Sequence, residues 1–414
     1  MEIVDAGATY PKGFRASGHA CGLKRSGRPD LALITSDRPA AGAGVFTTNR
    51  VSAAPVRIGR ELLARGGLDF RGILTISGIA NAMTGAEGID DNRAVLRSAE
   101  EELSLPAGSL LPACTGIIGP RLPVDRIRSG LGALAGLLGR GREPDRRVAH
   151  AILTTDTRAK TVALRGRLAD GTPVRLGGIA KGSGMIAPRL RTRHATMLCF
   201  LTTDARATPG ALGRILGPGV DRSFNMVSVD GDTSTNDTVY LLANGAAGGG
   251  SSDGDPEFGR MVATALQTLA RAVARDGEGA TKLLTVTVRG ARTVPEARSA
   301  AKAVVGSTLV KAAIFGADPN VGRIACALGY SGARIDPDRF DVVLRLPRSE
   351  IALINAGRPA AGLDNGQGKR LRELLVRLEE VPIEIRLHEG RARATAWGCD
   401  LSYAYVQINA AYHT

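Results

Sequence analysis

Helical and strand-like patterns alternate through the second half of this 414-residue chain, and the alternation limits the folds open to it. From Phe258 to Val273, apolar residues recur at the spacing that lines one face of a helix. Asp255 and Pro256 supply a start signal for this helix, and Gly277 lies just beyond its end. One more helical run and three strand-like runs follow: Glu296–Val305, Leu283–Val288, Val342–Leu346 and Ile383–Leu387. Such alternation predicts a mixed α/β architecture.

Three shorter patterns lie before that region. The segment from Thr161 to Leu176 predicts a hairpin, because two short runs of alternating apolar residues flank Asp170-Gly171. The run from Leu122 to Leu138 predicts a helix. The glycine-rich segment from Gly245 to Gly254 predicts a surface loop between elements.

The composition is that of a globular chain, with 43% hydrophobic and 23% charged residues. Aromatic residues make up only 4%, so the core must be built mainly from Ala, Val, Leu and Ile. The N-terminus carries Glu2 and Asp5 and lacks the apolar run of a secretory signal. The longest apolar candidate, Leu131 to Gly139, is far too short to span a bilayer. We therefore expect a cytoplasmic protein with no membrane partner.

The number and spacing of the cysteines argue against a disulfide framework. Their count is odd, and no two form a Cys-x-x-Cys pair, which favours reduced core thiols: Cys21, Cys114, Cys199, Cys326 and Cys399. The five histidines are equally scattered, without the spacing to Cys, Asp or Glu that a metal site needs. We predict no metal.

The formal net charge of +14 has two interpretations. A nucleic-acid-binding protein would cluster its Lys and Arg against phosphates, and Arg140 to Arg147 or Arg189 to His194 are candidate patches. However, no aromatic residues interleave with these runs to stack bases, and basic residues are spread along the chain. The pattern favours an Arg-rich surface around a site for an anionic substrate, and we predict no nucleic-acid partner.

A glycine-rich stretch from Lys181 to Pro188 is followed a few residues later by Ala195 and Thr196. A threonine hydroxyl is a weak nucleophile until a base takes its proton. Cleavage of the bond before Thr196 would free an α-amine on the same residue, and such an amine, with a pKa of about 8, is a competent base near neutral pH. One scission would thus supply both nucleophile and base. We predict self-cleavage after Ala195, which gives fragments 1–195 and 196–414.

This stretch resembles the self-cleavage site of the ornithine acetyltransferase family, the bifunctional glutamate N-acetyltransferases of arginine synthesis. Seven further segments resemble the family in its own order: Pro11–Ala16, Ala43–Asn49, Cys114–Gly119, Thr154–Thr157, Asp230–Thr238, Asp276–Lys282 and Ile408–Ala410. The similarity covers essentially the whole chain. It implies a self-cleaving N-terminal-threonine acyltransferase fold. In that fold the two fragments jointly build a layered helix and sheet core, and a smaller C-terminal region closes the site.

The resemblance also implies an activity. Thr196 attacks the amide carbonyl of N-acetylornithine, forms an acetyl ester and passes the acetyl group to glutamate. The hydroxyl of Thr115 and the backbone N–H of Gly116 match the groups that stabilise the oxyanion. By analogy we expect two copies of each fragment, an α2β2 heterotetramer. No cofactor is required, and acetyl-CoA stays open as a second acyl donor.

Thr196 and five further residues match substrate-binding positions of the family: Thr154, Lys181, Glu278, Asn409 and Thr414. Lys181 suits an α-carboxylate, and Glu278, in a turn after the predicted helix, suits an ammonium group. A role for Thr414 requires the C-terminal tail to fold back into the site. Asp230 to Thr238 is rich in short hydroxyl and carboxyl side chains, so we expect it to support the site through hydrogen bonds to the backbone.

The chain departs from the family pattern at several positions. Arg189 to His194 lengthens the link before Thr196, which makes Thr192 a second candidate for the cleavage point. Ile79 stands where the family usually has asparagine, Met83 where it often has cysteine, and Val321 where it usually has tryptophan. These changes leave open a related acyltransferase of a secondary-metabolite pathway.

Two other classes also stay open. The same threonine machinery would act as an amidohydrolase or aminopeptidase if water took the acyl group. A basic binding protein with a decayed cleavage loop is the non-enzymatic alternative, and the Arg-rich insert is its only support. Retained self-cleavage would count against that alternative.

Overall fold

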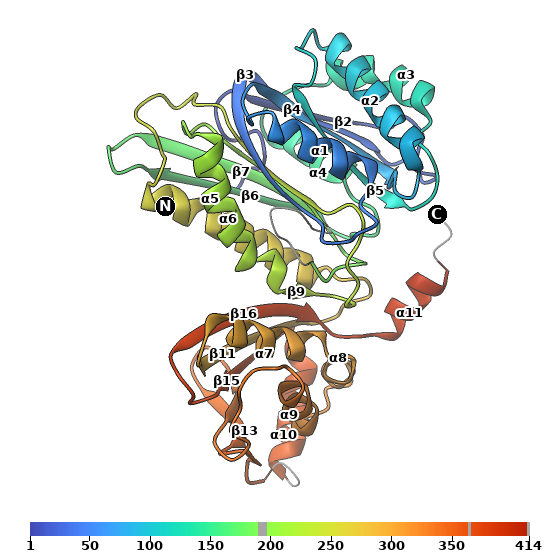
Figure 1. Ribbon diagram of the computed structural model, residues 1–414. Helices are drawn as coiled ribbons and strands as arrows, with labels where there is room; N and C mark the ends of the chain where they lie inside the picture. Colours follow the sequence, from blue (N-terminus) through green and yellow to red (C-terminus); the bar gives the residue numbers. More distant parts are fainter. Residues whose placement is uncertain (189–196, 363–365, 412–414) are drawn as a thin grey trace. The chain divides into compact units, whose positions relative to one another are not determined.

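The computed structural model describes residues 1–188, 197–362 and 366–411, which form two compact units (Figure 1). Unit 1 comprises Met1–Asn225 and Asp232–Leu269, and unit 2 comprises Met226–Gly231 and the described chain from Ala270 onward. Each unit is a mixture of helices and sheet, as the alternating sequence pattern predicts. Within the described residues, no helix is long and apolar enough to cross a membrane.

The described part of unit 1 is built on a nine-stranded sheet. Its strands in spatial order are β1 (Glu2–Val4), β6 (Lys160–Arg167), β7 (Pro173–Lys181), β8 (Leu198–Thr203), β10 (Thr238–Ala243), β3 (Leu31–Phe46), β4 (Phe70–Ile79) and β5 (Leu110–Ile117), with β2 (Phe14–His19) paired to β3. The predicted hairpin is confirmed, because β6 and β7 pair antiparallel. In the middle, β8 pairs antiparallel with β7 and parallel with β10. Strands from both sides of the predicted cleavage point therefore share one sheet.

Small residues make room for the few aromatic rings of unit 1. Tyr240 on β10 packs edge-on to Phe46 and stacks on Phe200, and its hydroxyl donates to the Pro112 carbonyl at 3.0 Å. A Cβ atom at Gly59 would lie 2.2 Å from the Tyr240 hydroxyl, so no larger residue fits there. This arrangement agrees with the composition, since the remaining core is mainly aliphatic.

Helices cover the sheet of unit 1. They are α1 (Ala54–Ala64), α2 (Gly85–Glu102), α3 (Val124–Gly136), α4 (Arg142–Ala151), α5 (Pro209–Asp221) and the first part of α6 (Pro256–Arg275), which continues into unit 2. A short 3₁₀ turn, η1, spans Phe224–Met226. The predicted helix over 122–138 is confirmed as α3, and the one over 258–273 as α6. The apolar face of α6 is fully buried, as its spacing requires.

Unit 2 has a seven-stranded sheet in its described residues. The strand order is β14 (Arg358–Pro359), β13 (Glu350–Asn355), β12 (Asp341–Arg345), β15 (Glu380–Arg386), β11 (Leu283–Ala291), β16 (Ala392–Cys399) and β9 (Val227–Ser228). Its helices are α7 (Val294–Gly306), α8 (Thr308–Phe315), α9 (Val321–Gly329), α10 (Gly366–Arg377) and α11 (Tyr403–Ala410). The three predicted strands are confirmed as β11, β12 and β15, and the predicted helix as α7, which packs on β11 and β16.

Candidate active site

Three predicted site residues meet in unit 1. Lys181 is the last residue of β7, Thr115 lies near the end of β5, and Thr154 lies in the loop between α4 and β6. The Lys181 Nζ atom is 2.7 Å from Thr154 Oγ1 and 3.3 Å from Thr115 Oγ1. Because an ammonium group has only donors, both hydroxyl oxygens accept these hydrogen bonds.

A buried carboxylate holds this lysine from the other side. The side chains of Lys181 and Asp156 are 8% and 0% exposed, and their charged atoms lie 3.8 Å apart. Asp156 Oδ1 also accepts from Lys160 Nζ and from the Gly182 N–H, each at 2.7 Å. Burial raises the pKa of Asp156, but Lys181, Lys160 and the Gly182 N–H outweigh burial and hold that pKa at about 2.

The ammonium groups of Lys181 and Lys160 thus both lie beside the Asp156 carboxylate. The buried ammonium of Lys181 also donates to two hydroxyl groups, and a cation with such donors suits an anionic group of a ligand. Asp156 and Lys160 are functional candidates that sequence reasoning missed. The local signal was an aspartate in a threonine-rich segment four residues before a lysine, which does not reveal that both are buried.

The strand end that carries Thr115 is irregular. Ile79 of β4 pairs with both Thr115 and Ile117 of β5, so the register shifts at this point. Gly116 has a φ of +133°, and a Cβ there would lie 2.2 Å from the Gly78 carbonyl carbon. Only glycine fits, and such bulges re-aim the groups at the end of a strand.

The run from Asp232 to Thr238 supports this strand end from unit 1. Asn236 Nδ2 donates to the carbonyls of Ala80, at 2.5 Å, and of Cys114, at 2.9 Å, the residue before Thr115. Thr233 Oγ1 donates to the Ala187 carbonyl at 2.9 Å and so fastens the glycine-rich stretch. The predicted hydrogen bonding between side chains and backbone is confirmed.

Glu278 and Asn409 meet in unit 2. Asn409 on α11 donates its Nδ2 to Glu278 Oε2 at 2.8 Å. Glu278 is buried in the turn after α6, where the sequence places it. Ser402 at the start of α11 donates to the Gly279 carbonyl at 2.6 Å, which fixes the helix beside that turn. This pair belongs to unit 2, whereas the lysine cluster belongs to unit 1.

The cleavage point lies outside the described residues, as do Ala195, Thr196, the alternative Thr192 and the terminal Thr414. The described chain on either side is well anchored. The Ala187 N–H donates to the Asp232 carbonyl at 2.9 Å, and the Thr238 N–H donates to the Met197 carbonyl at 2.6 Å. Leu198 pairs directly with Lys181 across β7 and β8. The strand that follows the predicted nucleophile therefore begins opposite the lysine of the cluster.

All five cysteines are free thiols, but the prediction of core thiols is wrong for Cys326, which is exposed, and for Cys21, which is half-buried. Burial raises the pKa of Cys114 and of Cys199 well above the ordinary thiol value, so both are poor nucleophiles. Within the ranges that the structure describes, no three His, Cys, Asp or Glu side chains come together as a metal would require.

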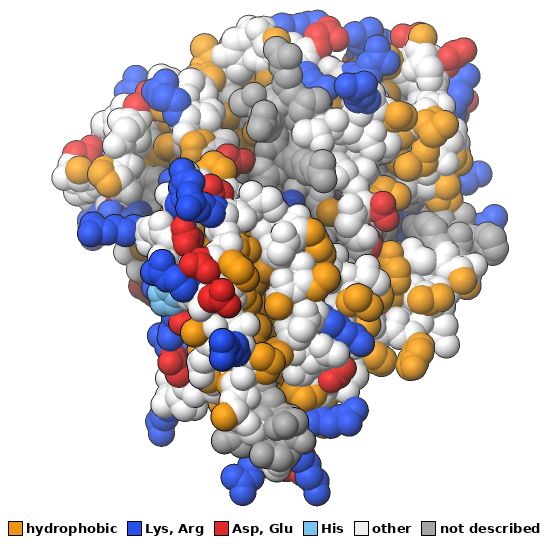
Figure 2. All heavy atoms as spheres, turned by 60° about the horizontal axis from the view of Figure 1, so that its bottom comes forward, with side chains coloured by type: hydrophobic (Ala, Val, Ile, Leu, Met, Phe, Trp, Pro, Cys, Tyr) orange, Lys and Arg blue, Asp and Glu red, His pale blue; other side chains and the backbone are white. Residues whose placement is uncertain are grey.

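The arginines of the basic run from Arg140 to Arg147 all have acidic partners. Each of its four arginines forms an ion pair, with Asp37, Asp5 or Glu143 as the partner. On the face drawn in Figure 2, Lys and Arg side chains are scattered, and several lie beside Asp or Glu. The second basic run, Arg189 to His194, lies outside the described residues.

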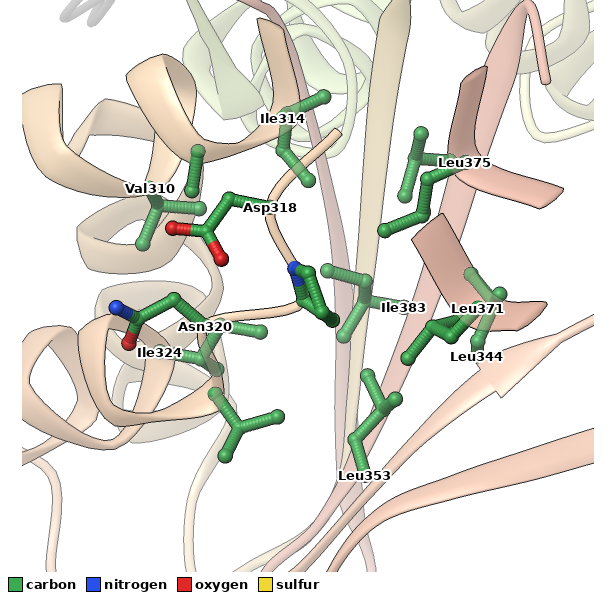
Figure 3. A pocket seen from close by; sticks show the side chains of 14 residues that line it. Val310, Ile314, Asp318, Asn320, Ile324, Leu344, Leu353, Leu371, Leu375 and Ile383 are labelled. Carbon is green, nitrogen blue, oxygen red and sulfur yellow. The ribbon is translucent and has the colours of Figure 1, made fainter. Parts of the chain in front are cut away.

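Unit 2 contains a small apolar pocket between its helices and its sheet (Figure 3). Its free volume is about 30 Å³, and aliphatic side chains from α8, α9, α10 and the sheet form most of the wall. Val321, the first residue of α9, is one of the residues that line it. The pocket contains none of the predicted site residues, and its lining is mostly apolar.

This mixed α/β chain gathers a buried lysine and two threonine hydroxyls, a set of groups that can bind an anionic group of a substrate. The family model named ArgJ family matches residues 15–414, and the chain belongs to that family. It is 42% identical over 414 residues to the glutamate N-acetyltransferase of Methanocaldococcus jannaschii, with 100% of both chains covered. It is 46% identical over 421 residues to the arginine biosynthesis bifunctional protein ArgJ of Symbiobacterium thermophilum, again with 100% of both covered.

A solved structure is also similar, the arginine biosynthesis bifunctional protein ArgJ from Bacillus halodurans. The two are 41% identical, with a TM-score of 0.47, over 51% of this chain and 97% of that chain. The resemblance inferred from the sequence motifs is thus confirmed at the level of the family.

Proposed function

We propose that this protein is a glutamate N-acetyltransferase of arginine biosynthesis, which moves an acetyl group from N-acetylornithine to glutamate. The observation that carries the proposal is the 42% identity to a glutamate N-acetyltransferase over the full length of both chains. Relatives named as arginine-biosynthetic bifunctional proteins point the same way. None of these names favours the amidohydrolase or the basic binding protein, so the transferase is preferred to both.

In this proposal the chain cuts itself between Ala195 and Thr196 into fragments 1–195 and 196–414. Thr196 then carries both the nucleophilic hydroxyl and an α-amine that takes its proton. Support comes from the sheet, where Leu198, two residues after Thr196 in the sequence, pairs with Lys181. In the sequence, Thr196 therefore lies within two residues of the strand pair β7–β8, which ends at the lysine cluster.

The reaction proceeds in two transfers. The Thr196 hydroxyl attacks the acetyl carbonyl, and the resulting oxyanion collapses as the C–N bond breaks and the ornithine amine leaves with a proton. The glutamate amine then attacks the acetyl ester, and N-acetylglutamate leaves as the Thr196 hydroxyl is restored. Thr115, through its hydroxyl, and Gly116, through its N–H, stabilise both oxyanions. The contact of Thr115 Oγ1 with Lys181 Nζ and the left-handed backbone of Gly116, where only glycine fits, support the assignment.

Lys181 and Thr154 bind the substrate α-carboxylate in this scheme, and Glu278 with Asn409 binds the ammonium of the ornithine side chain. The buried ammonium of Lys181 supports the first assignment, and the buried carboxylate of Glu278 supports the second. Thr414 completes the amino-acid site. We further propose an α2β2 heterotetramer in the cytoplasm. Acetyl-CoA is to be assayed as a second donor, because relatives are named bifunctional.

Intact mass and N-terminal sequencing of the purified protein test the nucleophile. Two fragments, the second starting at Thr196, and an uncut Thr196→Ala variant would support the proposal. A second fragment that starts at Thr192 would move the site. Acetyl transfer from N-acetylornithine is then measured with and without glutamate. Release of ornithine at the same rate without glutamate would identify an amidohydrolase. An uncut, inactive wild type would support the alternative of a basic binding protein.

A further inference from the structure

Lys181 determines the direction in which the hydroxyl proton of Thr115 points. The hydroxyl carries one proton, and the neighbouring Lys181 ammonium at 3.3 Å has no acceptor. The contact therefore uses a lone pair of Thr115 Oγ1, and the hydroxyl proton points away from the lysine. A hydroxyl that accepts from a cation is also polarised, so it becomes a better donor to an anion.

Lys181 is in turn held by a set of fixed contacts. Asp156 Oδ2 lies 3.8 Å from Lys181 Nζ and accepts from the Thr154 N–H at 3.2 Å. Its other oxygen accepts from Lys160 Nζ and from the Gly182 N–H. The carboxylate thus fixes the backbone at Thr154, whose hydroxyl accepts from Lys181, and at Gly182, the next residue after Lys181. Since Lys181, Lys160 and the Gly182 N–H outweigh the effect of burial and keep the pKa of Asp156 at about 2, the carboxylate stays charged at neutral pH.

We propose that Asp156, seated by Lys160, is a positioning residue for acyl transfer. It fixes the Lys181 ammonium against Thr115, so that Thr115 turns its single proton to the oxyanion. The inference rests on the proposed function, because it assumes that Thr115 faces an oxyanion. It extends that function to two residues, Asp156 and Lys160, which touch no substrate and act through Lys181.

The competing explanation is that Asp156 only anchors the end of β7. Both explanations predict some loss of activity in Asp156→Asn, so activity alone does not separate them. A double-mutant cycle does separate them. If Asp156 acts through Thr115, removing the Thr115 hydroxyl leaves Asp156 nothing to act upon, and the second mutation costs little.

The experiment compares wild type, Asp156→Asn, Thr115→Val and the double variant, each first checked for self-cleavage. We expect Asp156→Asn to lower kcat by about tenfold and Thr115→Val by about 100-fold, with smaller changes in KM. The double variant should match Thr115→Val alone within about threefold. Fold-losses in kcat that multiply, or an unchanged kcat in Asp156→Asn, would overturn the proposal.

Asp145→Asn is the matched control. Asp145 is likewise a buried carboxylate that accepts from two backbone N–H groups, those of Gly7 and Thr9. These partners lie in the N-terminal segment and not at the lysine cluster, so the variant should leave kcat unchanged, alone or combined with Thr115→Val. If Asp156→Asn stays uncut, Lys160→Met, which removes the lysine that seats Asp156, takes its place in the same cycle. If both stay uncut, the cluster serves folding or cleavage and the proposal is wrong.

The behaviour of the wild type distinguishes failure of this inference from failure of the proposed function. A cut wild type that transfers no acetyl group to glutamate overturns the proposed function. A cut wild type that transfers acetyl but shows multiplying losses overturns only the role of Asp156.

Discussion

Lys181 in unit 1 and Lys282 in unit 2 are both buried lysines, yet their surroundings differ in kind. Lys181 donates to two side-chain hydroxyls and faces one carboxylate. Lys282 donates to three backbone carbonyls, those of Leu375, Val376 and Leu378, at 2.8 to 3.1 Å. These carbonyls form the C-terminal end of α10, where the helix dipole favours a cation. The Lys282 ammonium donates only to backbone carbonyls and so stabilises the fold, whereas the Lys181 ammonium donates to side-chain hydroxyls that can bind a ligand.

The largest expected effect is a loss of activity when the unit 1 lysine, Lys181, is replaced. Lys181→Met removes the cation that polarises Thr115 and balances a substrate carboxylate, so kcat/KM should fall by about 1000-fold or more. The free energy of unfolding should change far less, because Asp156 keeps Lys160 as its partner. Steady-state kinetics and a urea melt of the same preparation measure both. A variant that keeps its activity but melts early would make Lys181 a purely structural lysine.

The reverse result is expected for Lys282. Lys282→Met leaves three carbonyls at the end of α10 without their donor, at about 1 kcal/mol each, so the free energy of unfolding should fall by about 3 kcal/mol. The kcat of the folded variant at low temperature should match the wild type. Thermal melting and kinetics well below the melting temperature give the two numbers. Loss of kcat without loss of stability would refute the contrast between the two lysines.

The two lysines should also differ in acid, because the carboxylate beside Lys181 makes the free energy of unfolding depend on pH. The pKa of Asp156 falls from 3.8 to about 2 in the folded chain, so its ionised form stabilises the fold above pH 3.8. That stabilisation, about 2 kcal/mol, is lost as the pH falls from about 4 to 2. Urea unfolding at a series of pH values should show this loss in the wild type. In Asp156→Asn the loss over that range should be smaller by about the same amount.

The smallest expected effect concerns the packing of unit 2. Val321 lines an apolar pocket with room for a group at least as large as a water molecule, which an added methylene group can enter. Val321→Ile should therefore raise the free energy of unfolding by about 0.5 to 1 kcal/mol without changing kcat. Differential melting against the wild type measures this change. Val376→Ile, the same substitution at an exposed position of α10, is the matched control and should not share the gain.

Several elements of the molecule could be predicted from the sequence. The period of the apolar residues from Phe258 to Val273 identified α6, because a helix with one buried face repeats its apolar positions every three or four residues. The Asp170-Gly171 turn likewise placed β6 and β7 as a hairpin. The motifs from Lys181 to Asn409 identified the family and named the candidate nucleophile, Thr196.

Other features were decided only by tertiary structure. β8 and β10 are short and buried on both faces, so they show no alternation that would reveal their place or order in the sheet. The roles of Asp156 and Lys160 depend on which charges meet when three distant strand and loop ends converge. Sequence determines which charges are present, but burial and proximity set their energies, because electrostatic interactions depend on distance and on the exclusion of water.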